Sequence, residues 1–499
     1  MVAFVLAALV FACVRTWADP DLWGHLRFGQ DLWDTGRVAR GDPYSYLTGD
    51  RPWINHEWLA EAIFARVFSA LGAPGLIALK TLLSLSVAGL LYRRLMRHGL
   101  DALAAGLVLT AFTVLVVPGV TTVRPQVWSY VLFALLLFLV EAAEAGAAAP
   151  LVLVPLLFAL WANLHGAFLV GLGTYLVWGA AHLLDALAAR GPAPSARSAR
   201  PWPVLASMGA ACAATLLNPY GLDLWRSLGS ATDRRLELVE WNPLVLPSLL
   251  GAVYLIALGV AIAAMLGSRL PRPRPLAAVF ACAALLPLVA VRHTPFFAIA
   301  ALFVSAPHIA PAFGRWWAGR WGTPVAGGRF RPVVAAALGA GALGLLGLSA
   351  PYVRCIAVEP AEYPVRAVAL LRQHAASGDM AVFLEWGDYA LWHLGPRVKV
   401  SGDTRREMVY SDPAYRANLR FAHGTGDWDA VLRRGDASLA LVSKRFPTFN
   451  LMALEPAWRL VSEDDTSALF ARRGSSADAR LPAAAPRAET SHDRPGCFP

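Results

Sequence analysis

The stretch "ADPDLWGHLRFGQ" (Ala18–Gln30) follows an almost unbroken apolar opening and presents two carboxylates at once. Asp19 is a suitable N-cap, Pro20 a suitable first helical residue, and Asp21 favours the positive end of a helix. The apolar residues that follow recur at helical spacing, which predicts an amphipathic helix over 21–36 that lies in the membrane interface. The two acids therefore either only start this helix or, kept ionised there, accept a proton or bind a cation.

The composition indicates a polytopic membrane protein. The chain has 499 residues, of which 57% are hydrophobic and 16% are charged, whereas soluble proteins have about 25% charged residues. The mean hydropathy is +0.49. The net charge of +10 suggests cytoplasmic loops that face anionic lipid. The sequence has no stretch of interleaved basic and aromatic residues that would indicate a nucleic-acid partner. The five cysteines show no spacing typical of a metal site or a disulfide framework.

Apolar segments long enough to cross ~30 Å of hydrocarbon recur about eleven times. The first has no positively charged start and no convincing cleavage site, so we expect a retained span rather than a signal peptide. We place the spans near residues 1–17, 74–92, 101–118, 127–145, 150–163, 166–188, 201–217, 248–267, 275–291, 294–313 and 332–350.

The basic loops predict the orientation of these spans. Four arginine-rich loops fall on one side if the N-terminus is inside, and the positive-inside rule makes that side cytoplasmic. They are Arg93–Gly99, Ala189–Pro201, Gly267–Pro275 and Gly314–Pro332. The opposite, extracytoplasmic side then holds the long loops 18–73 and 218–247 and everything after about 351.

The C-terminal part has a different pattern. "PVRAVALLRQHAA" is amphipathic at helical spacing, and "MAVFLE", "RVKVSG", "ASLALVS" and "WRLVSE…SALFARR" are typical of strands. We expect residues 1–350 to form a transmembrane domain with a first outer loop at 18–73, and residues 351–473 to form an extracytoplasmic α/β domain. Residues 474–499 are polar and rich in Ala and Pro, which is typical of a disordered tail.

A second polar cluster lies in the first outer loop. In "RPWINHEWLAEAIFARVF", Asn55 can cap a helix, and His56 and Glu57 come directly before it. These side chains are either a solvated helix start or part of a site with Asp19 and Asp21. Two carboxylate-bearing helix starts in one loop favour a site.

Four ionisable residues fall at span ends that the topology brings to the outer side: Arg124, His165, Arg292 and His293. Ionisable groups at membrane depth are costly and tend to be functional. Arginine and histidine suit a phosphate leaving group, because charge-assisted hydrogen bonds strengthen as negative charge develops. The alternatives are that the arginines snorkel to lipid phosphate and that His165 is a hydrogen-bonded packing histidine.

The order of these parts resembles the GT-C superfamily of glycosyltransferases, which use polyprenyl-phosphate-linked sugars. The resemblance consists of an apolar first span, an acid-bearing outer loop, many further spans and an outer α/β domain. "DPDLWGHLRFGQ…GDPYSYLTGDRPWINHEWL" (Asp19–Leu59) is similar to bacterial membrane proteins placed in that group. The resemblance implies that Asp21, or Asp19, is the catalytic base or helps bind a metal.

The outer domain carries a second resemblance. "FLEWGDYALWHL" (Phe383–Leu394) resembles the Trp-Trp-Asp-Tyr-Gly block of oligosaccharyltransferase catalytic subunits, with Gly387 in place of the second tryptophan. The resemblance implies acceptor binding by Trp386, Asp388 and Tyr389. In the strand-end loop "SGDTRRE", Asp403 and Arg405 are further candidates for acceptor binding. The alternatives are an aromatic helix start packed on the sheet and ordinary solvated charges.

We therefore expect a GT-C-like enzyme of the cell (inner) membrane that transfers a sugar from a polyprenyl-phosphate donor to an acceptor on the extracytoplasmic face. Candidate donor- and phosphate-binding residues are Arg124, His165, Arg292, His293, His56 and Glu57. A divalent metal such as Mg or Mn would bind Asp19, Asp21 and Glu57. The alternatives are a transporter or flippase of lipid-linked glycans, and an enzyme like oligosaccharyltransferases or O-antigen ligases that transfers whole glycans. The oligomeric state is not indicated.

Overall fold

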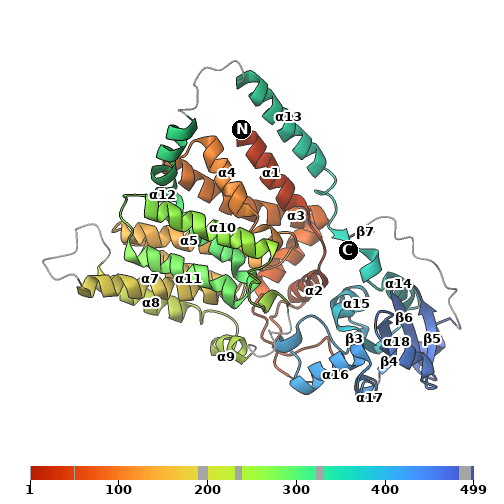
Figure 1. Cartoon of the computed structure of the whole chain (residues 1–499). Helices are drawn as coiled ribbons and strands as arrows, with labels where there is room; N and C mark the ends of the chain where they lie inside the picture. Colours follow the sequence, from red (N-terminus) through yellow and green to blue (C-terminus); the bar gives the residue numbers. More distant parts are fainter. Residues whose placement is uncertain are drawn as a thin grey trace. The chain divides into compact units, whose positions relative to one another are not determined.

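The computed structural model describes residues 2–49, 51–188, 200–230, 239–321, 331–435, 437–482 and 496–499. The chain forms two compact units (Figure 1). The first contains Met1–Thr16, Pro74–Leu222 and Thr232–Arg354, and the second contains Trp17–Ala73, Asp223–Ala231 and Cys355–Pro499. The first outer loop therefore belongs to the same unit as the C-terminal domain.

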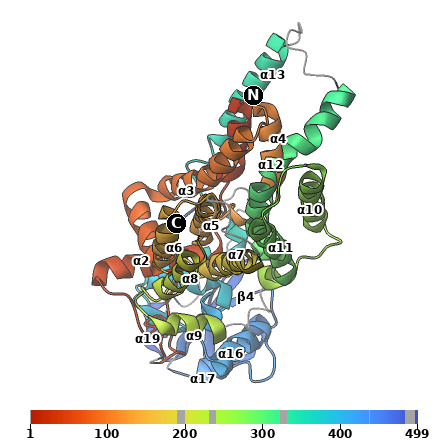
Figure 2. The ribbon, with the colours of Figure 1, turned by 90° about the vertical axis from the view of Figure 1, so that its left-hand side faces the viewer.

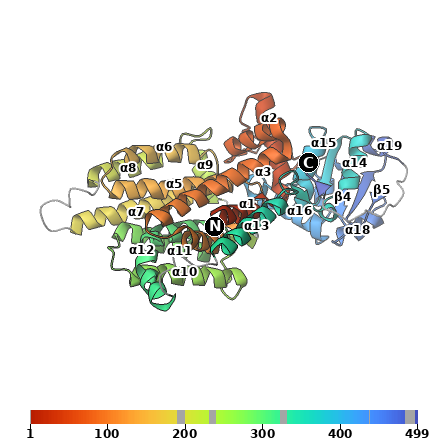
Figure 3. The same cartoon turned by 90° about the horizontal axis from the view of Figure 1, so that it is seen from above.

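The first unit is helical. Its described helices are α1 (Val2–Val14), the second half of α3 (Trp58–Arg97), α4 (Ala102–Thr113), α5 (Gln126–Glu144), α6 (Ala149–Trp161), α7 (Phe168–Ala188), α8 (Pro201–Ala214), α10 (Leu249–Gly267), α11 (Arg274–Val289), α12 (Thr294–Trp321) and α13 (Arg331–Ser349). Helices α5, α6, α7 and α8 lie side by side (Figure 3). Helices α4 and α13 pack against α1, and α10 and α11 pack against α12 (Figure 2).

Each expected apolar segment coincides with one of these helices. Among the described residues, five helical segments are long and apolar enough to cross a membrane, and α1, α4, α6, α11 and α13 contain shorter apolar stretches. The number of about eleven spans therefore remains a prediction. Residues 189–199 of the basic loop Ala189–Pro201 and residues 322–330 of the basic loop Gly314–Pro332 lie outside the described residues. Helix α12 continues into the second of these expected loops, as far as Trp321.

The second unit contains a mixed five-stranded sheet with the order β3-β2-β4-β6-β5. Its strands, each of which overlaps an expected run, are β2 (Gly378–Val382), β3 (Val398–Val400), β4 (Ala437–Ser443), β5 (Trp458–Glu463) and β6 (Ser467–Arg472). Strands β3, β2 and β4 are parallel, and β6 is antiparallel to β4 and β5. The described helices of the C-terminal part are α14 (Val365–Gln373), α15 (Gly387–Leu394), α16 (Asp412–His423), α17 (Ala430–Arg433), α18 (Thr448–Leu454) and α19 (Ser476–Arg480).

The first outer loop packs into this unit. Helix α2 (Pro20–Thr35) confirms the predicted helix, whereas its place in the membrane interface stays a prediction. It ends at Gly36, whose φ of 64° is easily adopted only by glycine. Helix α15 contacts α2 and β3 (Figure 1). Further along the loop, the Val400 N–H donates to the Tyr44 carbonyl at 3.0 Å, and the Tyr46 N–H donates to the Val400 carbonyl at 3.2 Å. The loop thus extends the edge of the sheet.

Two features of the C-terminus differ from our expectations. Cys355 and Cys497 form a disulfide across 142 residues. Strands β1 (Ala357–Val358) and β7 (Gly496–Cys497) pair antiparallel beside it. The segment 474–499 is therefore not disordered throughout, because part of it forms α19 and its last residues are fixed by the disulfide and β7. Residues 483–495 lie outside the described part of the chain.

The disulfide predicts a difference in thiol reactivity. The chain has five cysteines, and Cys13, Cys212 and Cys282 are free. When the protein is denatured without reductant and alkylated, we expect intact mass spectrometry to detect label on these three thiols only. Prior reduction should give five labels. Five labels without reduction would contradict the pairing.

Candidate functional site

The start of α2 carries the two acids of the opening stretch. Asp19 is the N-cap, and its carboxylate accepts a hydrogen bond from the Leu22 N–H at 3.2 Å. Asp21 lies in the first turn, is half-buried, and contributes to the electrostatic field at His25 and Asp388. The capping interpretation therefore describes Asp19, and Asp21 remains the better candidate for a base.

The buried face of α2 holds this corner in place. Trp23 is fully buried, and its ring lies 4.6 Å from Tyr363, 5.2 Å from Tyr389 and 5.1 Å from Phe498. Gly24 lies against Asp388, whose Oδ1 would be 2.6 Å from a Cβ at that position. Burial of the large indole ring and the absence of a side chain at Gly24 together let α2 approach α15 closely.

A histidine and two glutamates meet where α2 contacts the start of α3. His25 Nδ1 lies 3.0 Å from Glu61 Oε1 and 4.0 Å from Glu57 Oε2. Asn55 donates to the other oxygen of Glu61 and also accepts a hydrogen bond from the Glu57 N–H at 3.1 Å. His56 Nε2 lies 3.6 Å from Glu57 Oε1. Glu57 was an expected site residue, whereas His25 and Glu61 were not.

Opposing effects set the charge of His25. Burial disfavours its protonated form, but the hydrogen bond with Glu61 and the charges of Glu57, Glu61 and Asp21 outweigh burial and raise its pKa to about 9. Without a metal, His25 is therefore an imidazolium ion at neutral pH, paired with Glu61.

The same donor set fits a divalent metal. One donor atom each from His25, Glu57 and Glu61 can lie within 4.8 Å of the others. An imidazole nitrogen with two carboxylates is a ligand set that suits zinc, manganese or iron. The expected metal ligands Asp19 and Asp21 are not in this cluster, which shares only Glu57 with our prediction.

The aromatic block of the C-terminal domain is buried. Trp386, Asp388 and Tyr389 are 3%, 0% and 6% exposed, and Asp403 is 0% exposed. Burial and then the charge of Asp403 raise the pKa of Asp388 well above its usual value, although Thr404 donates to its Oδ2. These side chains leave no open surface for an acceptor, so their burial does not fit the direct acceptor contact that we expected.

Arg405 joins the outer loop to the domain. Its guanidinium makes a two-pronged contact with Asp403, with nitrogen–oxygen distances of 2.9 and 2.5 Å, and it reaches Asp42 at 2.8 Å. The rings of three loop residues surround it at 4.7 to 5.0 Å: Phe28, Tyr44 and Trp53. The Arg405 side chain is only 7% exposed, so it acts as a structural ion rather than as a binding residue at the surface.

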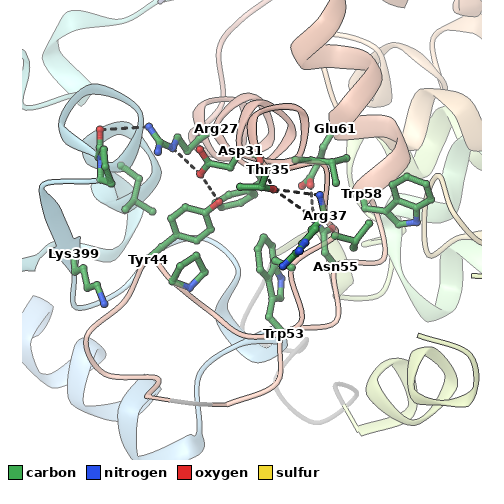
Figure 4. A pocket seen from close by; sticks show the side chains of 18 of the residues that line it. Arg27, Asp31, Thr35, Arg37, Tyr44, Trp53, Asn55, Trp58, Glu61 and Lys399 are labelled. Atoms are coloured by element: carbon green, nitrogen blue, oxygen red, sulfur yellow. Dashed lines mark hydrogen bonds and ion pairs between the residues drawn. The ribbon is translucent and has the colours of Figure 1, made fainter. Parts of the chain in front are cut away.

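A cavity of about 670 Å³ opens in this unit (Figure 4). Its wall combines α2, the loop after α2, the start of α3 and the end of α15 with β3. The polar and aromatic side chains that line it are Arg27, Phe28, Asp31, Thr35, Arg37, Tyr44, Trp53, Asn55, Trp58, Glu61 and Lys399. Glu61 belongs both to this wall and to the candidate metal site formed with His25 and Glu57.

Four of the six expected donor- and phosphate-binding residues lie in the first unit, whereas His56 and Glu57 lie in the second. Arg124 and Arg292 both contact Glu240, at 3.4 and 2.9 Å, and the Arg292 guanidinium lies 4.4 Å from the ring centroid of Trp241. His293 lies beside the same Trp241 ring. The structure thus brings both arginines and His293 together around Glu240 and Trp241, two residues that the sequence does not mark as part of a site.

His165 takes part in a separate network. It is 6% exposed, and its Nδ1 lies 2.8 Å from the Ser129 hydroxyl, which also accepts a hydrogen bond from the Trp161 indole at 2.7 Å. These contacts favour the interpretation of His165 as a packing histidine.

Comparison with known proteins gives a fold relationship. No known family model matches the chain, and no curated protein matches it. The oligosaccharyltransferase of Archaeoglobus fulgidus in its apo form aligns with a TM-score of 0.56 at 11% identity, over 88% of this chain and 69% of that one. ArnT from Cupriavidus metallidurans, bound to undecaprenyl phosphate, aligns with a TM-score of 0.55 at 13% identity, over 97% and 98%. Another structure of the archaeal enzyme holds zinc and sulfate, with a TM-score of 0.54 at 13% identity, over 88% and 68%.

The chain therefore has the GT-C-like fold, as the resemblance implied. The alignment with ArnT covers nearly all of both chains, and the long apolar helices agree with a multi-pass membrane protein.

The contact between α2 and α3 generates a first prediction for this site. A Cβ at Gly29 would overlap the Glu61 backbone carbonyl, whereas one at Gly173 on α7 would meet nothing within 4 Å. We expect Gly29→Ala to lower stability by about 1–3 kcal/mol through overpacking. Gly173→Ala should be neutral or stabilise by up to about 1 kcal/mol, as replacement of a helical glycine usually does. Thermal unfolding in detergent measures both, and equal melting temperatures would contradict the close helix contact.

The histidine–glutamate cluster generates a second prediction. After treatment with EDTA, we expect the protein to bind a single Zn²⁺ or Mn²⁺ ion in equilibrium dialysis, and expect His25→Gln and Glu61→Gln to abolish binding. His182→Gln is a matched control, because His182 also lies 3.0 Å from a glutamate, Glu144, and should leave binding unchanged. Metal retained by both cluster variants would contradict the site.

Proposed function

We propose that this chain is an integral membrane glycosyltransferase that uses a polyprenyl-phosphate-linked sugar as donor. The observation that carries the proposal is the packing of the acid-bearing first loop into the C-terminal domain, within a chain of GT-C-like fold. A flippase has no need of a fixed half-buried carboxylate beside a metal-binding cluster and a cavity. Two structural neighbours, the archaeal oligosaccharyltransferase and ArnT, have structures with dolichol phosphate and with undecaprenyl phosphate, which supports a lipid-linked donor.

We propose Asp21 as the base. The acceptor hydroxyl oxygen bonds to the anomeric carbon, the bond from that carbon to the phosphate oxygen breaks, and the hydroxyl proton goes to the Asp21 carboxylate. Polyprenyl phosphate leaves with the electron pair, and the configuration at the anomeric carbon inverts. The position of Asp21 at the N-terminus of α2 supports this role, because the helix dipole favours its ionised form.

The first unit offers an anion-binding group. Arg124 and Arg292 hold the Glu240 carboxylate, which supports their role in binding the lipid phosphate, since guanidinium groups bind carboxylate and phosphate with similar geometry. A metal ion, if bound by His25, Glu57 and Glu61, would supply a positive charge that polarises an oxygen of the substrate.

The disulfide supports the orientation that we propose. Disulfides persist in oxidising compartments and are rare in the cytosol. The Cys355–Cys497 bond therefore agrees with a C-terminal domain on the extracytoplasmic face of the cell (inner) membrane.

The proposed base leads to a direct test. Purified protein in nanodiscs is supplied with a panel of polyprenyl-phosphate sugars, and released polyprenyl phosphate is measured. We expect Asp21→Asn to lower the turnover by about 10²–10⁴-fold, the usual contribution of a general base. Asp223→Asn is the control, because Asp223 is an exposed acid in the first turn of α9 (Leu222–Ser230). Unchanged turnover in Asp21→Asn would refute the base, and no release from any donor, together with glycan flipping in vesicles, would favour the transporter.

A further inference from the structure

The cavity of the second unit has the chemistry of a site for a charged sugar. Its volume of about 670 Å³ lies within the range of small-molecule pockets, roughly 300–1,000 Å³. Apolar and aromatic residues make one part of the wall, and a few polar groups converge on the space. Sugar rings need this combination, because they have apolar faces and hydroxyl edges.

The Asp31 carboxylate is fixed by hydrogen bonds to one of its oxygens, and its other oxygen can accept a hydrogen bond from a ligand. Its Oδ2 accepts hydrogen bonds from Arg27 Nε at 2.9 Å and from the Tyr44 hydroxyl at 2.7 Å. Its Oδ1 has no hydrogen-bond partner among the described residues, and the side chain is 27% exposed. Arg27 also donates to the Gly395 carbonyl at 3.4 Å, which ties this group to the opposite wall. A carboxylate fixed in this way can accept a hydrogen bond from a sugar hydroxyl without losing side-chain entropy.

The cavity also has two uncompensated positive charges. Arg27 is paired with Asp31, and Glu61 with His25. The remaining cations, Arg37 and Lys399, are exposed and form no ion pair within the described part of the chain. A ligand with an anionic substituent would gain charge-assisted hydrogen bonds from them.

The far wall connects the cavity to the candidate metal site. Figure 4 shows Lys399 and Glu61 on opposite sides of the cavity, with Asp31 and Tyr44 between them. Glu61 and Asn55 line the wall near His25, and Glu61 belongs to the candidate metal site. A ligand held by the two cations therefore extends toward that cluster.

We propose that this cavity binds the acceptor, and that the acceptor is a saccharide carrying an anionic group such as a uronate or a phosphate. The assignment of this saccharide as acceptor rests on the proposed function, whereas its binding does not. Lys399 and Arg37, which line different parts of the cavity (Figure 4), each bind an anionic group. Asp31 accepts hydrogen bonds from ring hydroxyls, and Trp58 contacts a sugar face.

Calorimetry on full-length protein in nanodiscs tests this without any donor. The probes are tetragalacturonate, its methyl ester, a phosphorylated maltotetraose and neutral maltotetraose. We expect at least one anionic saccharide to bind about tenfold more tightly than its neutral counterpart. Added salt should reduce this preference, because it screens the charges. The double variant Arg37→Gln/Lys399→Gln should lose that preference, and Asp31→Asn should weaken anionic and neutral forms alike.

A matched double variant controls for the removal of charge. Arg51 and Arg397 are exposed in the same unit but do not line the cavity, so Arg51→Gln/Arg397→Gln should bind like the wild type. Equal losses in both double variants, or no preference for either anionic saccharide, would overturn the proposal. The proposal would also be overturned if an acidic tetrapeptide of Asp and Glu bound as tightly as the anionic saccharides and lost this affinity in Arg37→Gln/Lys399→Gln. Release of polyprenyl phosphate without saccharide binding would refute only this inference, and binding without release from any donor would refute only the proposed function.

Discussion

The second unit depends on the burial of one charge. Arg405 lies inside the protein between Asp403 of the C-terminal domain and Asp42 of the first loop, with three aromatic rings of the loop around it. A buried guanidinium without its partners costs several kcal/mol, so removal of one partner typically destabilises by about 3–5 kcal/mol. The loop therefore supplies one of the carboxylates and all three aromatic rings that surround the buried arginine of the domain. The loop and the domain are separated by more than 300 residues of sequence.

This constraint has consequences for function. The loop that carries Asp21, His25, Glu57 and Glu61 is held by packed rings, by backbone hydrogen bonds to the sheet and by the buried ion pairs. Groups held in this way are preorganised, which is what proton transfer and metal binding require. The buried Asp388 fits the same account, because a carboxyl group packed against Gly24 supports α2 rather than binding a substrate.

Local sequence patterns predicted much of this structure. They did not reveal contacts between residues that are far apart in the sequence. The cap at Asp19, the helix up to Gly36, the five strands of the main sheet and the apolar segments were all recognisable, since each depends on neighbours within a few residues. The pairs His25–Glu61, Asp42–Arg405 and Cys355–Cys497 are 36, 363 and 142 residues apart. A single sequence, without a structure, does not show which distant residues come into contact. The same limit made Asp403 and Arg405 resemble surface charges, because their burial depends on the loop.

Amide hydrogen exchange in Arg405→Met tests most directly whether the loop and the domain form one unit. The substitution keeps a long side chain but removes the charge that links Asp42 to Asp403. The account predicts faster exchange at Tyr46 and Val400, whose N–H groups join the loop to β3, together with the amides around Asp403. If exchange at Tyr46 and Val400 stayed as slow as in the wild type while only the amides near Asp403 changed, the buried charge would not hold the loop to the domain.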